Sequence, residues 1–173
     1  MTTLRILVAC VGNIFLGDDG FGVDVARRLA GRSVASDIIL KDFGIRGFAL
    51  TYALLEPYDL VILVDACPRG GEPGTVYLIE PDPGPPPTDA PVRIETHGMN
   101  PMNVLRMVKS MGGAPNRVLI VGCEPLDLGT DEEGKLGLSE PVAAAVDVAC
   151  DMIETLVAKT LHEKSTGAVS QSR

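Results

Sequence analysis

The sequence predicts an α/β fold, a three-layer α/β/α sandwich around a mostly parallel twisted sheet of about five strands. Apolar runs of strand length alternate along the chain with helical patterns, which is typical of a parallel sheet. The run over residues 60–64 is apolar throughout, which indicates a strand covered by helices on both faces. Because 173 residues suit one core, we expect a single domain over residues 1–163.

The first half of the chain is expected to hold three strands and two helices. Each expected strand is a mainly apolar run, and each expected helix carries apolar residues at helical spacing. The strands are residues 4–11, 38–41 and 59–66, and the helices are residues 20–29 and 48–55. Strand and helix therefore alternate from the first element onward.

The second half is expected to add two strands and two helices. Residues 74–80 alternate more than the other strands, so we place them near an edge of the sheet, and residues 117–123 form the last buried strand. Pro101 stands at the start of one helix, and Ser139 precedes a long final helix. Residues 164–173 are small and polar, and we expect them to form a disordered tail.

The crossing from the first strand to the first helix, GNIFLGDDGFG over residues 12–22, holds four glycines and two adjacent acids. The spacing of Gly12 and Gly17 matches a P-loop, but Asp18 and Asp19 stand where that loop needs lysine and serine or threonine. Two carboxylates would repel a phosphate, so a nucleotide-binding module is the weakest alternative. One acid could cap the following helix, but a cap needs only one side chain, so the pair favours a cation.

Right-handed crossovers place the first three strands in the order 2-1-3. The first and third strands are then neighbours, and the chain leaves them in opposite directions, so a crevice is expected beyond their carboxyl ends. Asp18 and Asp19 follow the first strand, and Asp65 lies at the end of the third. The sequence therefore predicts carboxylates from two strands in one crevice.

The chain has two histidines. His162 lies among charged residues near the end of the last helix, and we expect it to be exposed to solvent. His97 lies in a glycine-flanked loop before a helix, where it is either a loop histidine or a metal ligand. If that loop reaches the crevice, two carboxylates and an imidazole meet there, a donor set that suits Ni²⁺, Zn²⁺ or Cd²⁺.

Composition excludes several classes of protein. The net charge of −8, the absence of tryptophan and an aromatic content of 4% disfavour a nucleic-acid binder. No apolar run approaches the roughly 20 residues of a membrane span, and no signal peptide is visible, so we expect a cytoplasmic protein. The four cysteines form no C-x-x-C pair and are expected to be small buried hydrophobes. Without a heptad pattern or a large apolar excess, a monomer is the default expectation.

From Leu4 to about Val157, the chain resembles the hydrogenase maturation endopeptidases. The most specific part of the resemblance is residues 12–22, with support from residues 64–66, from His97 before a helix and from residues 137–139. The resemblance implies an endopeptidase that removes a C-terminal peptide from the large-subunit precursor of a nickel-iron hydrogenase. It also implies the same sandwich fold.

By this resemblance, three residues contact the nickel already placed in the precursor: Asp19, Asp65 and His97. Nickel is then a recognition mark on the substrate rather than a permanent cofactor. One loop departs from the family pattern, because members often carry Asp-Gly-Gly-Thr-x-Gly where residues 42–47 read DFGIRG. That loop could contact the precursor, so the identity of the hydrogenase served does not follow from the resemblance.

Cleavage without a protein nucleophile is the mechanism that we expect. No G-x-S-x-G elbow is present, and no cysteine is placed beside His97 in the sequence. Water can attack the scissile carbonyl with Asp19 or Asp65 as the base, while nickel acts as a Lewis acid or only positions the peptide. Two other functions remain open: a metallohydrolase with resident zinc, which lacks the usual H-E-x-x-H here, and a non-enzymatic nickel-binding or precursor-docking maturation factor.

Overall fold

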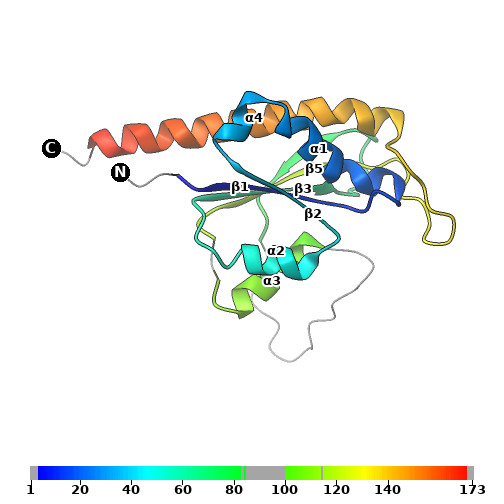
Figure 1. Ribbon diagram of the computed structural model, residues 1–173, viewed down its shortest axis with the longest axis horizontal. Coiled ribbons are helices and arrows are strands. Elements are labelled where there is room, and N and C mark those ends of the chain that lie inside the picture. Colours follow the sequence, from blue (N-terminus) through cyan, green and yellow to red (C-terminus); the bar gives the residue numbers. More distant parts are fainter. Residues whose placement is uncertain (1–3, 83, 85–99, 114, 171–173) are drawn as a thin grey trace.

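The structure is a computed structural model that describes residues 4–82, 84, 100–113 and 115–170 (Figure 1). A five-stranded sheet forms the middle layer. The helices α1 and α4 cover one face of this sheet, and α2 and α3 cover the other (Figure 1). The predicted three-layer α/β/α sandwich is thereby confirmed.

The strands of the sheet follow the order β2-β1-β3-β5-β4. Their bounds are Ile6–Val11 for β1, Ile39–Gly44 for β2, Leu60–Ala66 for β3, Val76–Ile79 for β4 and Val118–Cys123 for β5. All neighbours are parallel except β4, which runs antiparallel to β5. The predicted order of the first three strands and the edge position of the fourth are both confirmed. The carboxyl ends of β1, β3 and β5 therefore lie side by side at the same end of the sheet.

The helices connect these strands. Their bounds are Phe21–Ala30 for α1, Gly47–Ala53 for α2, Pro101–Ser110 for α3 and Glu140–Ser170 for α4, with short 3-10 helices η1 at Gly17–Gly20 and η2 at Ser33–Ser36. The last helix continues to Ser170, so residues 164–170 are helical where disorder was expected. Lys164 Nζ lies 3.4 Å from Asp59 Oδ1 before β3, a contact with the rest of the fold that local composition does not reveal. None of the helices described is long and apolar enough to cross a membrane.

The core lies in two layers because successive strand residues point to opposite faces. Along β1, Ile6, Val8 and Cys10 face α1 and α4, whereas the residues between them face α2 and α3. Three of the four cysteines are buried and Cys67 is partly buried, and all four are free thiols. They pack as small apolar residues, as the sequence predicted.

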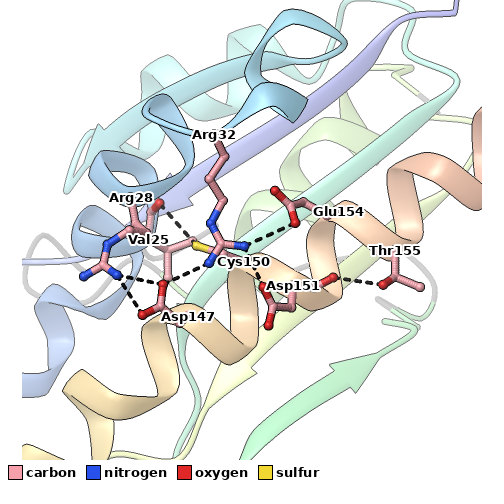
Figure 2. Close-up of polar contacts among 8 residues, drawn as sticks. All are labelled: Val25, Arg28, Arg32, Asp147, Cys150, Asp151, Glu154 and Thr155. Atoms are coloured by element: carbon pink, nitrogen blue, oxygen red, sulfur yellow. Dashed lines mark hydrogen bonds and ion pairs between the residues drawn. The ribbon is translucent and has the colours of Figure 1, made fainter.

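Arg28 of α1 and Arg32, two residues after the end of α1, connect this part of the chain to α4 through a network of ion pairs (Figure 2). Arg28 Nη1 lies 2.7 Å from each carboxylate oxygen of Asp147. Arg32 donates to three carboxylates at 2.6–3.2 Å, those of Asp147, Asp151 and Glu154. An isolated surface pair contributes little to stability, but a shared guanidinium in a network contributes more. The network helps to hold α1, and with it the glycine-rich crossing before it, against α4.

Gly22, in the first turn of α1, lies directly against the backbone of β1 and β3. A Cβ atom at this position would lie 2.2 Å from the Val11 carbonyl oxygen and 2.6 Å from that of Val64. Since both neighbours are strand backbone, the helix itself would have to move. We predict that Gly22→Ala lowers the free energy of unfolding by about 1–3 kcal/mol, measured by urea denaturation.

Gly167 of α4 provides the matched control, because no atom lies within 4 Å of its ideal Cβ position. Gly167→Ala should raise the free energy of unfolding by about 0.5–1 kcal/mol through helix propensity alone. Equal stability of Gly22→Ala and the wild type would show that α1 does not pack this closely on the sheet.

Candidate active site

Asp65 and Asp19 lie close together at the carboxyl ends of the parallel strands. Asp65 is the penultimate residue of β3 and only 6% exposed. Asp19 lies in η1, between β1 and α1, and η1 contacts β3. Asp19 Oδ2 accepts a hydrogen bond of 3.0 Å from the backbone N–H of Asn13, which fixes the direction of this carboxylate. The predicted meeting of carboxylates from two strands is therefore present.

The surroundings of the two carboxylates disfavour their ionised forms. Burial, followed by the charge of Asp19, raises the pKa of Asp65 well above its usual range, and the N–H of Ala66 only partly opposes this. Burial also raises the pKa of Asp19, against the opposing hydrogen bond from Asn13. A proton or a cation between the two groups would relieve both costs. This electrostatic arrangement suits general base chemistry and suits a positively charged guest.

Asp18, the neighbour of Asp19, has a different role. Its side chain is fully buried and accepts four hydrogen bonds: Oδ2 from the N–H groups of Leu126 and Asp127 and from Ser139 Oγ, and Oδ1 from Ser139 N. The distances are 2.7–2.9 Å. Burial opposes ionisation, but these donors outweigh it and hold the pKa of Asp18 below its usual range. Asp18 thus fastens the loop after β5 and the start of α4 to the glycine-rich crossing.

Backbone contacts strengthen this connection. Gly17 N donates to the carbonyl oxygen of Lys135 at 2.7 Å, and Asp18 N donates to that of Asp127 at 2.9 Å. Gly12 has a φ of +148° and no room for a side chain, because a Cβ atom would lie 2.0 Å from the Asp19 carbonyl oxygen. The glycines therefore allow the chain to fold tightly enough to bring Asp19 back over the end of β1.

Glu124 is a buried carboxylate that the sequence analysis did not single out. It follows β5 and accepts hydrogen bonds from Arg69 N, Gly70 N and the Tyr77 hydroxyl at 2.8–3.1 Å. Burial opposes ionisation, but these donors hold the pKa of Glu124 below its usual range. Glu124 thus holds the segment after Asp65 in place. An acid directly after a buried strand was the available signal, although its partners are not visible in the sequence.

Cys67 lies two residues after Asp65 and is partly buried. Burial, followed by the charge of Asp65, raises its pKa to about 12. The sulfur is therefore a neutral thiol at physiological pH, which is a poor nucleophile. This state agrees with the expectation of cleavage without a cysteine nucleophile.

The loop over residues 42–47 carries two side chains that depart from the family pattern. One of them lies in the core and the other on the surface. Phe43 is 5% exposed and packs in the layer beneath α2, whereas Ile45 is 63% exposed. Arg46 closes the turn by donating to the carbonyl oxygens of Asp42 and Phe43. Of the two unusual side chains, only Ile45 is available to a partner.

His97 lies outside the described residues. Across residues 4–82, 84, 100–113 and 115–170, no three His, Cys, Asp or Glu side chains are grouped to hold a metal ion. His162 lies on the exposed surface of α4, as predicted. Two of the three residues expected to contact nickel, Asp19 and Asp65, are thus brought together, and the contact of all three with nickel stays a prediction.

The chain matches the model of the hydrogenase maturation protease family over residues 23–156. It is 36% identical over 154 residues to the hydrogenase expression/formation protein HupD of Rhizobium leguminosarum bv. viciae, covering 88% of this chain and 72% of that protein. Among solved structures, it is similar to the hydrogenase maturating endopeptidase HybD from E. coli, with a TM-score of 0.71, 25% identity and coverage of 91% of this chain and 94% of that one.

A second structure, the hydrogenase 2 maturation peptidase of a Thaumarchaeota archaeon, is 31% identical with a TM-score of 0.64. That match covers 88% of this chain and 97% of the other. The resemblance drawn from the glycine-rich crossing is thereby confirmed. The fold, the family match and the identity to these relatives agree: the chain belongs to the hydrogenase maturation protease family and is a hydrolase of that family.

Proposed function

We propose that this protein removes a C-terminal peptide from the large-subunit precursor of a nickel-iron hydrogenase after nickel has been inserted. In this proposal nickel belongs to the substrate, and Asp19, Asp65 and His97 contact it. The observation that carries the proposal is the pair of carboxylates from η1 and β3, where burial and the charge of Asp19 raise the pKa of Asp65. Such a pair gains most from a guest that brings its own positive charge.

The carboxylates can also supply the base for hydrolysis. A water molecule beside Asp19 or Asp65 would lose its proton to the carboxylate as it attacks the scissile carbonyl. A raised pKa makes a carboxylate a stronger base than an exposed aspartate, which supports this role. Nickel would either polarise the carbonyl as a Lewis acid or position the peptide against the water.

Intact-mass analysis of nickel-loaded and nickel-free precursor, each with and without this protein, tests the proposal. Loss of a C-terminal peptide from the nickel-loaded form alone is the expected result. Cleavage of both forms would support a protease that does not require nickel in its substrate. If no precursor were cleaved but the protein bound nickel or the precursor, a non-enzymatic maturation factor would be favoured instead.

Metal analysis of the purified protein tests the other alternative. The proposal requires no stoichiometric metal before the precursor is added. Stoichiometric zinc in active protein would favour a metallohydrolase with a resident ion. Treatment of this protein with a chelator, followed by dialysis, would then abolish cleavage of the nickel-loaded precursor. A protease that recognises nickel on its substrate would retain its activity after the same treatment.

A further inference from the structure

Five large apolar side chains are exposed on the glycine-rich crossing and on the loop that is hydrogen-bonded to it. Their exposed fractions run from 36% to 73%, and they come from two loops that are far apart in the sequence. We call this set the apolar rim: Ile14, Phe15, Leu126, Leu128 and Leu136. Single exposed apolar residues are ordinary, but several on neighbouring loops mark an interaction surface.

The apolar rim is joined to the site by consecutive hydrogen bonds. The N–H of Asn13 donates to Asp19 Oδ2, and the side-chain oxygen of Asn13 accepts from the N–H of Phe15, both at 3.0 Å. The rim therefore begins five residues before Asp19, and the same asparagine holds both. A polypeptide whose scissile bond reaches Asp19 would have its neighbouring residues close to the rim.

The two loops of the rim are also fastened to each other. The Asp18 carboxylate accepts from Leu126 N at 2.8 Å, and Lys135 N donates to the carbonyl oxygen of Phe15 at 2.7 Å. Leu16 and Lys135 pair in a bridge between the loops. The apolar side chains are thus presented on backbone that is already ordered, so binding would cost little conformational entropy.

Acidic residues lie in the same loop as part of this surface and form an acidic border on it. Asp131, Glu132 and Glu133 lie in the turn between Leu128 and Leu136, and all three are exposed. The nearest lysine in the same loop, Lys135, is paired with Asp127. An apolar surface with an acidic border is complementary to an apolar segment that carries lysine or arginine.

We propose that the apolar rim binds a segment of the hydrogenase precursor in which apolar side chains are flanked by lysine or arginine. This inference rests on the proposed function, because the occupant is its substrate. A second copy of this chain has a net charge of −8 and would be repelled by the acidic border, so a substrate segment that carries basic residues is the occupant that the charges favour. The rim would then contribute to affinity and register, while the carboxylates perform the chemistry.

The double variant Phe15→Ser/Leu136→Ser tests the proposal. Loss of two anchors at the centre of an interface should raise KM for nickel-loaded precursor about tenfold or more, with kcat close to that of the wild type. Met111→Ser is the matched control, because Met111 is also exposed, at 49%. Met111 follows α3 and precedes the start of β5, so it lies toward the amino ends of the strands, away from the rim. Its KM should equal that of the wild type.

A charge variant, Glu132→Lys/Glu133→Lys, tests the acidic border without changing any apolar residue. It should also raise KM, and the increase should shrink at high salt because exposed charges are screened. Thermal unfolding of every variant identifies any that are misfolded. An unchanged KM in a folded Phe15→Ser/Leu136→Ser protein would overturn the proposal while leaving the proposed function intact.

Equilibrium binding of the precursor, measured without cleavage, separates the two proposals. If the wild type cleaves no precursor, the proposed function fails. The dissociation constants then test by themselves whether the rim binds the precursor. A dissociation constant about tenfold higher for the double variant than for the wild type and Met111→Ser would support the rim as a docking surface. Equal dissociation constants would overturn it.

Discussion

Asp65→Asn is expected to reduce the rate of precursor cleavage by about 10²–10⁴-fold, and Asp19→Asn by a similar factor. Asparagine keeps the size of each side chain but cannot take a proton from water at neutral pH, and it offers a metal ion no negative charge. The measurement is single-turnover cleavage of nickel-loaded precursor, followed by intact mass. Wild-type rates in both variants would rule out the carboxylates as the reacting groups.

Stability measurements separate this loss of activity from misfolding. The pKa of Asp65 is raised in the folded protein, so its ionised form is less favourable there than in the unfolded chain. As pH rises above the pKa of the unfolded chain, the carboxylate therefore costs stability, and this cost is complete above the raised pKa, whereas asparagine does not titrate. Asp65→Asn should unfold at the same temperature as the wild type or higher, at neutral pH. Asp37→Asn is the matched control, because Asp37 is exposed between η2 and β2, and both its activity and stability should be unchanged.

Asp18→Ala is expected to lower the free energy of unfolding by about 2–4 kcal/mol, since it leaves several donors in a buried position without an acceptor. The N–H groups of Leu126, Asp127 and Ser139 lose the carboxylate that binds them. Amide hydrogen exchange should rise throughout residues 126–139, and urea denaturation measures the change in stability. Exchange rates like those of the wild type would show that the loop is held by other contacts.

The effect of Asp18 should depend on pH in a definite direction. Its pKa is lowered in the folded protein, so its stabilising contribution is present above the pKa of the unfolded chain and is lost as pH falls through the folded value. The difference in unfolding temperature between wild type and Asp18→Ala should be constant between about pH 6 and 8 and should narrow below about pH 4. Asp18→Asn keeps one acceptor oxygen and should lose less stability than Asp18→Ala.

Much of this fold could be predicted from the sequence because its signals are local. Apolar runs and helical spacing locate the strands and helices, and the handedness of crossovers orders β2, β1 and β3. That order alone predicts a crevice beyond β1 and β3, where Asp18 and Asp19 were expected to meet Asp65. The helical end of α4 was missed because the propensity of residues 164–170 is weak and the contact of Lys164 with Asp59 is not local.

The resemblance singled out Asp19 rather than Asp18, but the physical difference between these adjacent acids is visible only in the tertiary structure. Asp18 and Asp19 are identical in chemistry and adjacent in the sequence, yet one is a buried acceptor and the other faces Asp65. The donors that bind Asp18 lie 108–121 residues later in the chain, so no local pattern could show them. Glu124 and Phe43 follow the same rule, since each takes its role from residues that only folding brings near. The sequence by itself therefore determined that carboxylates are available at the ends of the strands, and the packing of distant backbone decided which of the two adjacent acids is tied up by hydrogen bonds and which is left beside Asp65.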